Sequence, residues 1–316
     1  MSQAVLGIIF TLAFVLIESA QFVFFGSLFQ RISPLLFGFL VFGICCFFFL
    51  IWTRFARPEQ WRVAMAHPGL LLAVNLGAVV TFMAYLHSVK LIEPAITYTV
   101  SAGVMPLSAY AFYRLGFREG EPMRNGLEIV GNGLILVAIV SLIVAALTGH
   151  SGFVRGGIGS AVAGVALAIL DGVFFTLILV YSQRLSRLGL GPGSVLGLRL
   201  PLYVLATGTL AFGSGAGDSL PQWSELTWMI LIGLVLTVPP LYLLQKAVPL
   251  VSTLTMSALT ALGPLAVFSL QWLEGRVNFA PATLSGLVVY TIGAVLMAWG
   301  AVRGETIRYN QDKPNP

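Results

Sequence analysis

Two carboxylates stand in the middle of apolar stretches that are long enough to cross a membrane. Glu18 lies within residues 7–31 and Asp171 within residues 160–184. The two acids are 153 positions apart, and each stands twelve residues before a Gln-Arg dipeptide. An ionisable group at bilayer depth costs roughly 2.5 kcal/mol or more, so such groups usually serve a function. Their matched settings predict one site that is assembled from two related halves.

The acids could do two kinds of chemistry, and a structural role is also open. Either acid could carry coupling protons or anchor a cationic group, and a protonated carboxyl could instead hydrogen-bond a neighbouring helix. Gln21 and Phe22 follow Glu18 at helical spacing, and Phe175 follows Asp171 in the same way. These side chains could line a cavity with a few polar groups among aromatic ones. A single phenylalanine could equally face lipid or pack between helices.

Three more polar residues are candidates for substrate contact. Arg199 lies five residues inside an apolar segment, where its guanidinium could hold a substrate carboxylate bidentately or reach toward the lipid headgroups. Together with the two acids, it would suit a substrate that bears both an amine and a carboxylate. Tyr98 and Asn75 could also line the site, although isolated polar residues in membrane helices more often bond a neighbouring helix.

Composition places these residues in a membrane protein. Of the 316 residues, 58% are hydrophobic and 9% charged, and the mean hydropathy is +0.93. Soluble domains carry about 25% charged residues, so a soluble chain this apolar could not cover its surface. Apolar runs of about 20 residues also exclude an outer-membrane barrel. The net charge of +5 does not predict nucleic-acid binding, because in membrane proteins the position of basic residues matters more than their sum.

The sequence gives no support for an enzyme, a cofactor or a metal site. It contains no zinc-protease, nucleophile-elbow or phosphate-loop motif. Its three histidines are scattered over different segments, which argues against metal binding. We therefore expect the acids to serve binding or transport and not catalysis.

Ten apolar segments are predicted to be membrane helices, which makes the chain an all-α polytopic membrane protein. Each is long enough to cross about 30 Å of hydrocarbon. The segments are 4–28, 35–53, 69–89, 95–115, 127–148, 157–181, 194–213, 226–246, 250–272 and 282–303.

Basic residues predict the orientation of these helices. Alternate loops hold twelve Lys and Arg residues on one side and four on the other, with Arg199 inside a helix. The more basic side should be cytoplasmic. Both termini then lie inside the cell, and the expected location is the cell inner membrane.

The two halves of the chain match beyond the acids. Pro34 and Pro192 each precede a second helix, and a threonine precedes Pro106 and Pro264 by nine residues in both cases. We expect a first repeat over 1–150, a second over 151–304, and a polar cytoplasmic tail over 305–316. Because five helices is an odd number, the second repeat would be inverted in the membrane, as in many secondary transporters.

The pattern resembles the drug/metabolite transporter superfamily, in particular its EamA-type members. The resemblance covers nearly the whole chain. It rests on the proline-led second and seventh helices, Arg199 seven residues after Pro192, the mid-helix Pro106 and Pro264, Glu121 and Glu274 after the fourth and ninth helices, and the glycine pairs 126/133 and 286/293. The family often has a basic residue in the second helix where this chain has Val41. A carboxylate in both the first and sixth helices is not a general family feature.

The resemblance implies a secondary active transporter that works by alternating access. We expect export of a small polar or amphipathic metabolite, such as an amino-acid-like compound or an opine-type metallophore, with protons as the coupling ion. An importer or exchanger, an exporter of cationic drugs, and a membrane scaffold or receptor without transport are the alternatives. Pro106, Pro264, Pro239 and Pro240 are candidate hinges, because proline interrupts helix hydrogen bonding. The partners expected are the lipid bilayer and a small substrate, with the chain as a monomer or homodimer.

Overall fold

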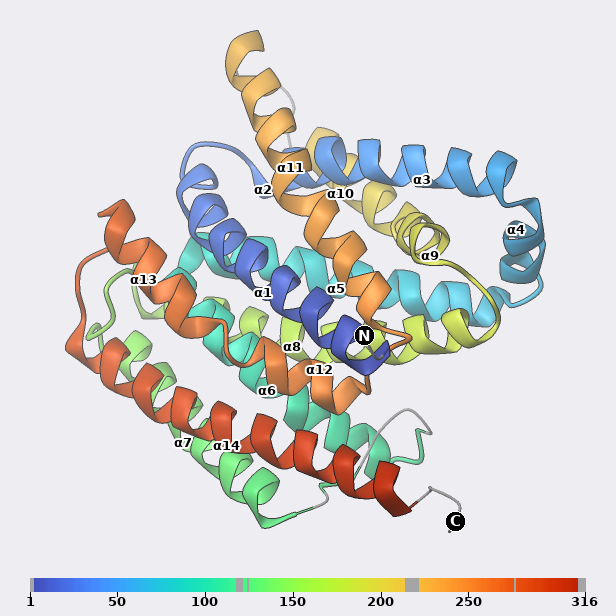
Figure 1. Cartoon of the computed structure of the whole chain (residues 1–316). Coiled ribbons are helices and arrows are strands. Elements are labelled where there is room, and N and C mark those ends of the chain that lie inside the picture. The colour runs from blue at the N-terminus through green and yellow to red at the C-terminus, as the bar shows by residue number, and fades with distance from the viewer. Residues whose placement is uncertain (1–2, 118–121, 124, 214–221, 276, 312–316) are drawn as a thin grey trace.

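The computed structural model describes residues 3–117, 122–123, 125–213, 222–275 and 277–311. The described residues form an all-α membrane protein in which the helices pack into one bundle (Figure 1). Nine of their helical stretches are long and apolar enough to cross a membrane. The chain is therefore a multi-pass membrane protein.

The described residues form fifteen helical elements. The first half contains α1 (Gln3–Leu28), α2 (Pro34–Phe37), the π-helix η1 (Gly38–Phe42), α3 (Gly43–Ala56), α4 (Pro58–Met65), α5 (Pro68–Leu91), α6 (Pro94–Arg114) and α7 (Gly126–Leu147). The second half contains α8 (Ile158–Arg187), α9 (Pro192–Leu198), α10 (Pro201–Gly213), α11 (Trp223–Ala247), α12 (Thr253–Thr260), α13 (Pro264–Glu274) and α14 (Pro281–Gln311).

The predicted segment 95–115 is helix α6, but it is not among the nine apolar spans. Its sequence carries many threonine, serine and tyrosine residues, which lower its hydropathy. Most of α6 is nevertheless buried, because it packs against α7, α8, α12 and α13. A helix that is enclosed by other helices does not need an apolar surface toward lipid, and its polar groups can bond to its neighbours.

Three of the predicted segments are irregular helices. The segment 35–53 contains the π-helix η1, the segment 194–213 is broken between α9 and α10, and the segment 250–272 is broken between α12 and α13. Pro201 and Pro264 stand at the start of the second piece in each broken pair. The first residue of a helix donates no hydrogen bond within that helix, so a proline, which lacks an N–H, costs no hydrogen bond there. All three irregularities lie inside the bundle, where other groups can satisfy the freed backbone atoms.

Two predicted boundaries differ from the structure. The connection after residue 53 contains the additional helix α4, which begins at Pro58. Helix α14 continues to Gln311 and does not end near residue 303, because no proline interrupts the chain before Pro314. Residues 312–316 of the predicted tail lie outside the described residues, as does Glu121.

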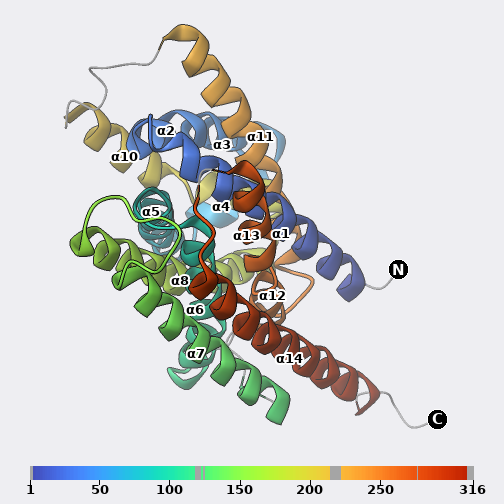
Figure 2. The same cartoon turned by 90° about the vertical axis from the view of Figure 1, so that its left-hand side faces the viewer.

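The helices pack in a pattern that joins the two halves. α5 lies against α8, α1 lies against α11, and α7 lies against α14. α6 packs on α8, while α1 packs on α12 and α13. Figures 1 and 2 both show α7 and α14 side by side along one edge of the bundle.

The connections gather at two ends of the bundle. At one, which we call the α4 end, Gln60 of α4 accepts a hydrogen bond from the Gly191 N–H at 2.9 Å, and the Arg184 guanidinium lies 5.4 Å from the Phe117 ring. At the other, which we call the Glu93 end, Glu93 accepts a hydrogen bond from the Gly152 N–H at 2.8 Å. Arg155 donates a hydrogen bond to Gln30 at the same end, at 3.0 Å. In Figure 1 α4 lies toward the right and the α13–α14 connection toward the left.

Candidate functional site

The first acid, Glu18, is held by helix α6. Its side chain is half-buried, and its Oε2 accepts a hydrogen bond from the Tyr98 hydroxyl at 3.1 Å. The same hydroxyl lies 3.3 Å from the Thr260 carbonyl oxygen, at the break between α12 and α13. A Cβ on Gly263 would overlap the Tyr98 ring, so the glycine at this break makes room for the tyrosine. The broken helix therefore positions the phenol that contacts the acid.

The second acid, Asp171, is held by the same helix. Asp171 is buried, and its Oδ2 accepts a hydrogen bond from the Ser101 hydroxyl at 2.7 Å. The next residue, Gly172, lets α8 approach α6 closely, because a Cβ there would clash with the Ser101 carbonyl oxygen. Tyr98 and Ser101 stand one helical turn apart, so α6 presents a donor to each acid from one face. A movement of α6 would change the surroundings of both acids together.

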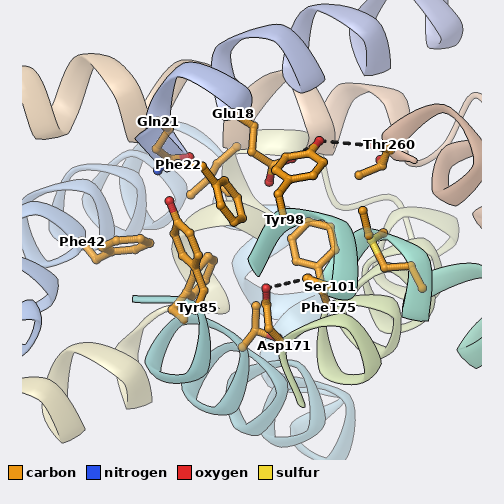
Figure 3. Close-up of a pocket in the computed structure, with 15 residues that line it drawn as sticks. Glu18, Gln21, Phe22, Phe42, Tyr85, Tyr98, Ser101, Asp171, Phe175 and Thr260 are labelled. Atoms are coloured by element: carbon orange, nitrogen blue, oxygen red, sulfur yellow. Dashed lines mark hydrogen bonds between the residues drawn. The ribbon is translucent and has the colours of Figure 1, made fainter. Parts of the chain in front are cut away.

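The two acids line one cavity, although they lie far apart in sequence (Figure 3). The cavity has about 30 Å³ of water-accessible space, which is room for roughly two water molecules. Its lining residues are Glu18, Gln21, Phe22, Phe42, Thr81, Phe82, Tyr85, Tyr98, Ser101, Ala102, Met105, Asp171, Phe175, Leu241 and Thr260. A metabolite would need a larger space, so its binding requires some of these side chains to move.

Four other predicted site residues lie in this cavity. Gln21 donates to the Thr237 hydroxyl of α11 at 3.3 Å, which connects the Glu18 face of α1 to the second half of the chain. Phe22 packs against Tyr85 and Tyr98, with ring centroids 4.5 and 4.7 Å apart. Phe175 also lines the cavity. The structure thus brings together both acids, Gln21, both predicted phenylalanines and Tyr98.

Arg199 lies beside the cavity and not in its lining. It is fully buried at the junction of α9 and α10, and its guanidinium carbon lies 5.9 Å from the centroid of the Phe82 ring. Because Phe82 also lines the cavity, its ring lies between the Arg199 guanidinium and the cavity. In this structure the Arg199 side chain does not extend to the surface.

Asn75 also lies at the α9–α10 junction, away from the cavity lining. Its amide nitrogen donates to the Leu198 carbonyl oxygen at 2.7 Å, and its amide oxygen accepts from the Leu202 N–H at 3.1 Å. Those two backbone groups are four residues apart and would bond to each other in an unbroken helix. The Asn75 side chain is therefore inserted into the helical ladder, and it satisfies the break beside Arg199.

The predicted hinge prolines occupy different settings. Pro106 lies inside α6, directly after the cavity-lining Met105, and Pro264 begins α13 directly after the break. Pro239 and Pro240 lie inside α11, which remains one helix through both residues. Leu241, which follows them, lines the cavity. Pro264 is thus the proline that stands at an actual interruption.

Sequence reasoning missed the hydroxyl and aromatic groups of α5 and Ser101. Thr81 and Tyr85 are four residues apart on α5 and line the cavity together. Ser101 follows Tyr98 by three residues, and this spacing alone could have identified it. Phe42 could not be found in this way, because the π-helix that contains it has no simple sequence signal. The described residues contain no group of three or more His, Cys, Asp or Glu side chains that could hold a metal.

Comparisons with known proteins describe the fold alone. No protein-family model matches the chain, and no curated protein matches it. Among solved structures, one described only as the crystal structure of a protein matches with a TM-score of 0.65 and 18% sequence identity. The match covers 98% of this chain and 99% of the other. The whole chain therefore shares its fold with a known structure, whose description states no activity.

Proposed function

We propose that the chain is a secondary active transporter of the EamA type, with Glu18 and Asp171 as its proton-coupling and substrate-binding acids. The observation that carries this proposal is the convergence of two carboxylates, 153 residues apart in the sequence, on one cavity inside the bundle. A scaffold or receptor gains nothing from two acids at equivalent positions in the membrane. A transporter can use them, because each can exchange a proton for a cationic group of the substrate.

We also propose that ten helices form two inverted repeats, and the packing of the helices supports this. When each helix of the first half is exchanged for its counterpart in the second, the packing of α5 on α8 becomes that of α11 on α1. The packing of α6 on α8 likewise becomes that of α12 and α13 on α1, and the α7–α14 pair maps onto itself. Transporters with this symmetry bind substrates between the repeats, near the membrane midplane, where discontinuous helices meet.

Alternating access would operate through α6. Because Tyr98 and Ser101 contact the two acids from one helix, protonation of either acid changes a hydrogen bond made by that helix. The small cavity fits a closed state between the two open ones. We further propose that the basic α4 end faces the cytoplasm of a cell whose inner membrane holds the protein, and that transport is outward.

The proposal is tested by proton-driven uptake into inside-out vesicles, with a mixture of radiolabelled protein amino acids and a radiolabelled lipophilic cation as probes. Wild-type vesicles with an acid interior should accumulate at least one probe. Glu18→Gln and Asp171→Asn should each abolish gradient-driven uptake, and the double variant should be little worse than either, since residues that act as a unit are not additive.

Glu59→Gln is the matched control, because Glu59 is an exposed carboxylate on α4. It should transport as the wild type does. Full gradient-driven uptake by the double variant would show that the two acids are structural and would refute the proposal.

A further inference from the structure

Arg199 is a buried charge whose guanidinium makes no hydrogen bond within the part of the chain that the structure describes. Its Nε, Nη1 and Nη2 atoms all lack a hydrogen-bond partner among the described residues. A guanidinium carries five N–H donors, and a buried charge is costly unless it is paired. The aromatic face of Phe82 gives some compensation but leaves every N–H unused.

More unused polar groups continue from Arg199 to the cavity. The hydroxyls of Thr81, Tyr85 and Tyr203 are buried and have no hydrogen-bond partner in the described part of the chain. Thr81 and Tyr85 line the cavity, while Tyr203 packs against the ring of Phe82 at 5.5 Å between centroids. Buried polar groups in native proteins are nearly all bonded, so a cluster of unbonded donors needs an explanation.

The aromatic ring of Phe82 separates the two parts of this cluster. It lines the cavity, and it also contacts Arg199 and Tyr203, which do not line it. Displacement of this one side chain would expose Arg199 to the cavity that holds the two acids. The insertion of Asn75 into the α9–α10 junction holds Arg199 at this position.

We propose that Arg199 is the anion subsite of the transport cavity, that Phe82 is its gate, and that the substrate is a zwitterion with an amine and a carboxylate. The carboxylate binds the Arg199 fork, and the amine binds at Glu18 and Asp171. This inference rests on the proposed transport function. It selects amino-acid-like compounds over cationic drugs, because a simple cation would leave Arg199 unpaired.

Binding to the purified protein in detergent tests the subsite without any transport assay. The probes are the free proteinogenic amino acids. Each is compared with its carboxamide, which keeps the amine and the side chain but lacks the negative charge. We expect at least one amino acid to raise the melting temperature of the wild type with an apparent affinity about tenfold to 100-fold above that of its amide. Arg199→Lys should remove this preference and keep the response to the amide, because a point charge cannot replace the planar fork.

Chemical labelling with phenylglyoxal, read at Arg199 by mass spectrometry, supplies a second measurement that keeps Arg199 in place. Phe82→Ala should accelerate labelling, and the preferred amino acid should suppress it while its amide does not. Phe268→Ala is the matched control, because Phe268 is a buried phenylalanine of α13 outside the cavity lining, where its ring packs on Phe279. It should leave the labelling rate of Arg199 near that of the wild type.

The outcomes separate this inference from the proposed function. Failure of every amino acid to exceed its amide, or a preference that survives Arg199→Lys, would overturn the anion subsite even if proton-driven uptake of the cation is found. A carboxylate preference that depends on Arg199, in a protein whose double amide variant still shows full gradient-driven uptake, would keep the subsite and refute proton coupling through the acids.

Discussion

Glu93 and Arg199 are both fully buried charged residues, and their surroundings are opposite. Glu93 accepts hydrogen bonds from the Gln271 amide, from the Thr283 hydroxyl at 3.0 Å and from the Gly152 N–H at 2.8 Å. Arg199 has no hydrogen bond at any of its three nitrogens within the described residues.

The difference separates a structural charge from one that is available to a ligand. The three donors to Glu93 come from α13, α14 and the 149–156 connection, so this carboxylate ties the second half of the chain to the start of α6. The Arg199 guanidinium joins no elements by hydrogen bonds within the described residues, although it lies at a helix break beside the cavity. A satisfied buried group stabilises one arrangement, whereas an unsatisfied one costs free energy until a partner arrives.

The largest effect expected is that of Glu93→Ala on stability. The substitution would leave three donors without an acceptor, and the two buried ones, on Gln271 and Thr283, would each cost about 1–3 kcal/mol. We expect the free energy of unfolding in detergent to fall by roughly 3 kcal/mol or more. Glu59→Ala, which removes an exposed carboxylate, should change it by less than about 0.5 kcal/mol. Equal effects of the two variants would show that the Glu93 hydrogen bonds do not stabilise the packing of the helices.

A smaller loss is expected for Asn75→Leu. The leucine has a similar size but cannot bond to Leu198 or Leu202, so two backbone groups at the α9–α10 junction lose their partners. We expect a loss of about 2 kcal/mol, measured by thermal unfolding. The variant should also lose the preference for carboxylate over carboxamide, because Arg199 is no longer held in place. A stable variant that keeps this preference would assign Asn75 no part in the subsite.

The substitution Arg199→Met is expected to stabilise the protein, in contrast to the two substitutions above. Methionine can fill the space along the arginine stem without an unpaired charge, so the ligand-free protein should become more stable by about 1 kcal/mol. Arg62→Met is the matched control, because Arg62 is exposed on α4 and its loss should change stability little. A marked destabilisation by Arg199→Met alone would indicate that the guanidinium has a structural role like that of Glu93.

The sequence predicted the site better than it predicted the distinction between these two charges. Glu18 and Asp171 could be paired because they stand at matched places in two similar stretches of sequence, and Gln21, Phe22 and Phe175 followed from helical spacing. Glu93 stood beside a proline and looked like an ordinary polar break between helices. Its donors come from residues 59 to 190 positions away, and such pairing leaves no local pattern.

The sequence predicted where the helices lie but not where they are irregular. Apolar length predicted the spans, but hydropathy gave no sign that the 194–213 and 250–272 segments are broken or that 35–53 contains a π-helix. Those irregularities depend on neighbours such as Asn75 and Tyr98, which bond to the freed backbone atoms. The role of Asn75 was invisible for this reason, because its partners are created by the break itself.

The smallest effect expected is a pH dependence that comes from Glu93. Burial raises the pKa of the Glu93 carboxyl above its usual range, against the hydrogen bonds from Gly152, Gln271 and Thr283 that lower it. Between the ordinary pKa of a glutamic acid and this raised value, the folded chain binds more protons at Glu93 than the unfolded chain does. The free energy of unfolding should therefore fall as the pH rises through this window, and level off above it.

Glu93→Gln isolates this contribution, because an amide does not titrate and the variant keeps every other ionisable group. The three groups that donate to Glu93 do not titrate either, so the difference between the two proteins reports the carboxyl itself. We expect the stability of the variant to lack the decline seen in the wild type, in thermal unfolding measured from mildly acidic to neutral pH. Parallel pH profiles would mean that the hydrogen bonds outweigh the effect of burial on the Glu93 pKa. Glu93 would then be ionised throughout the range and would join the two halves at every pH measured.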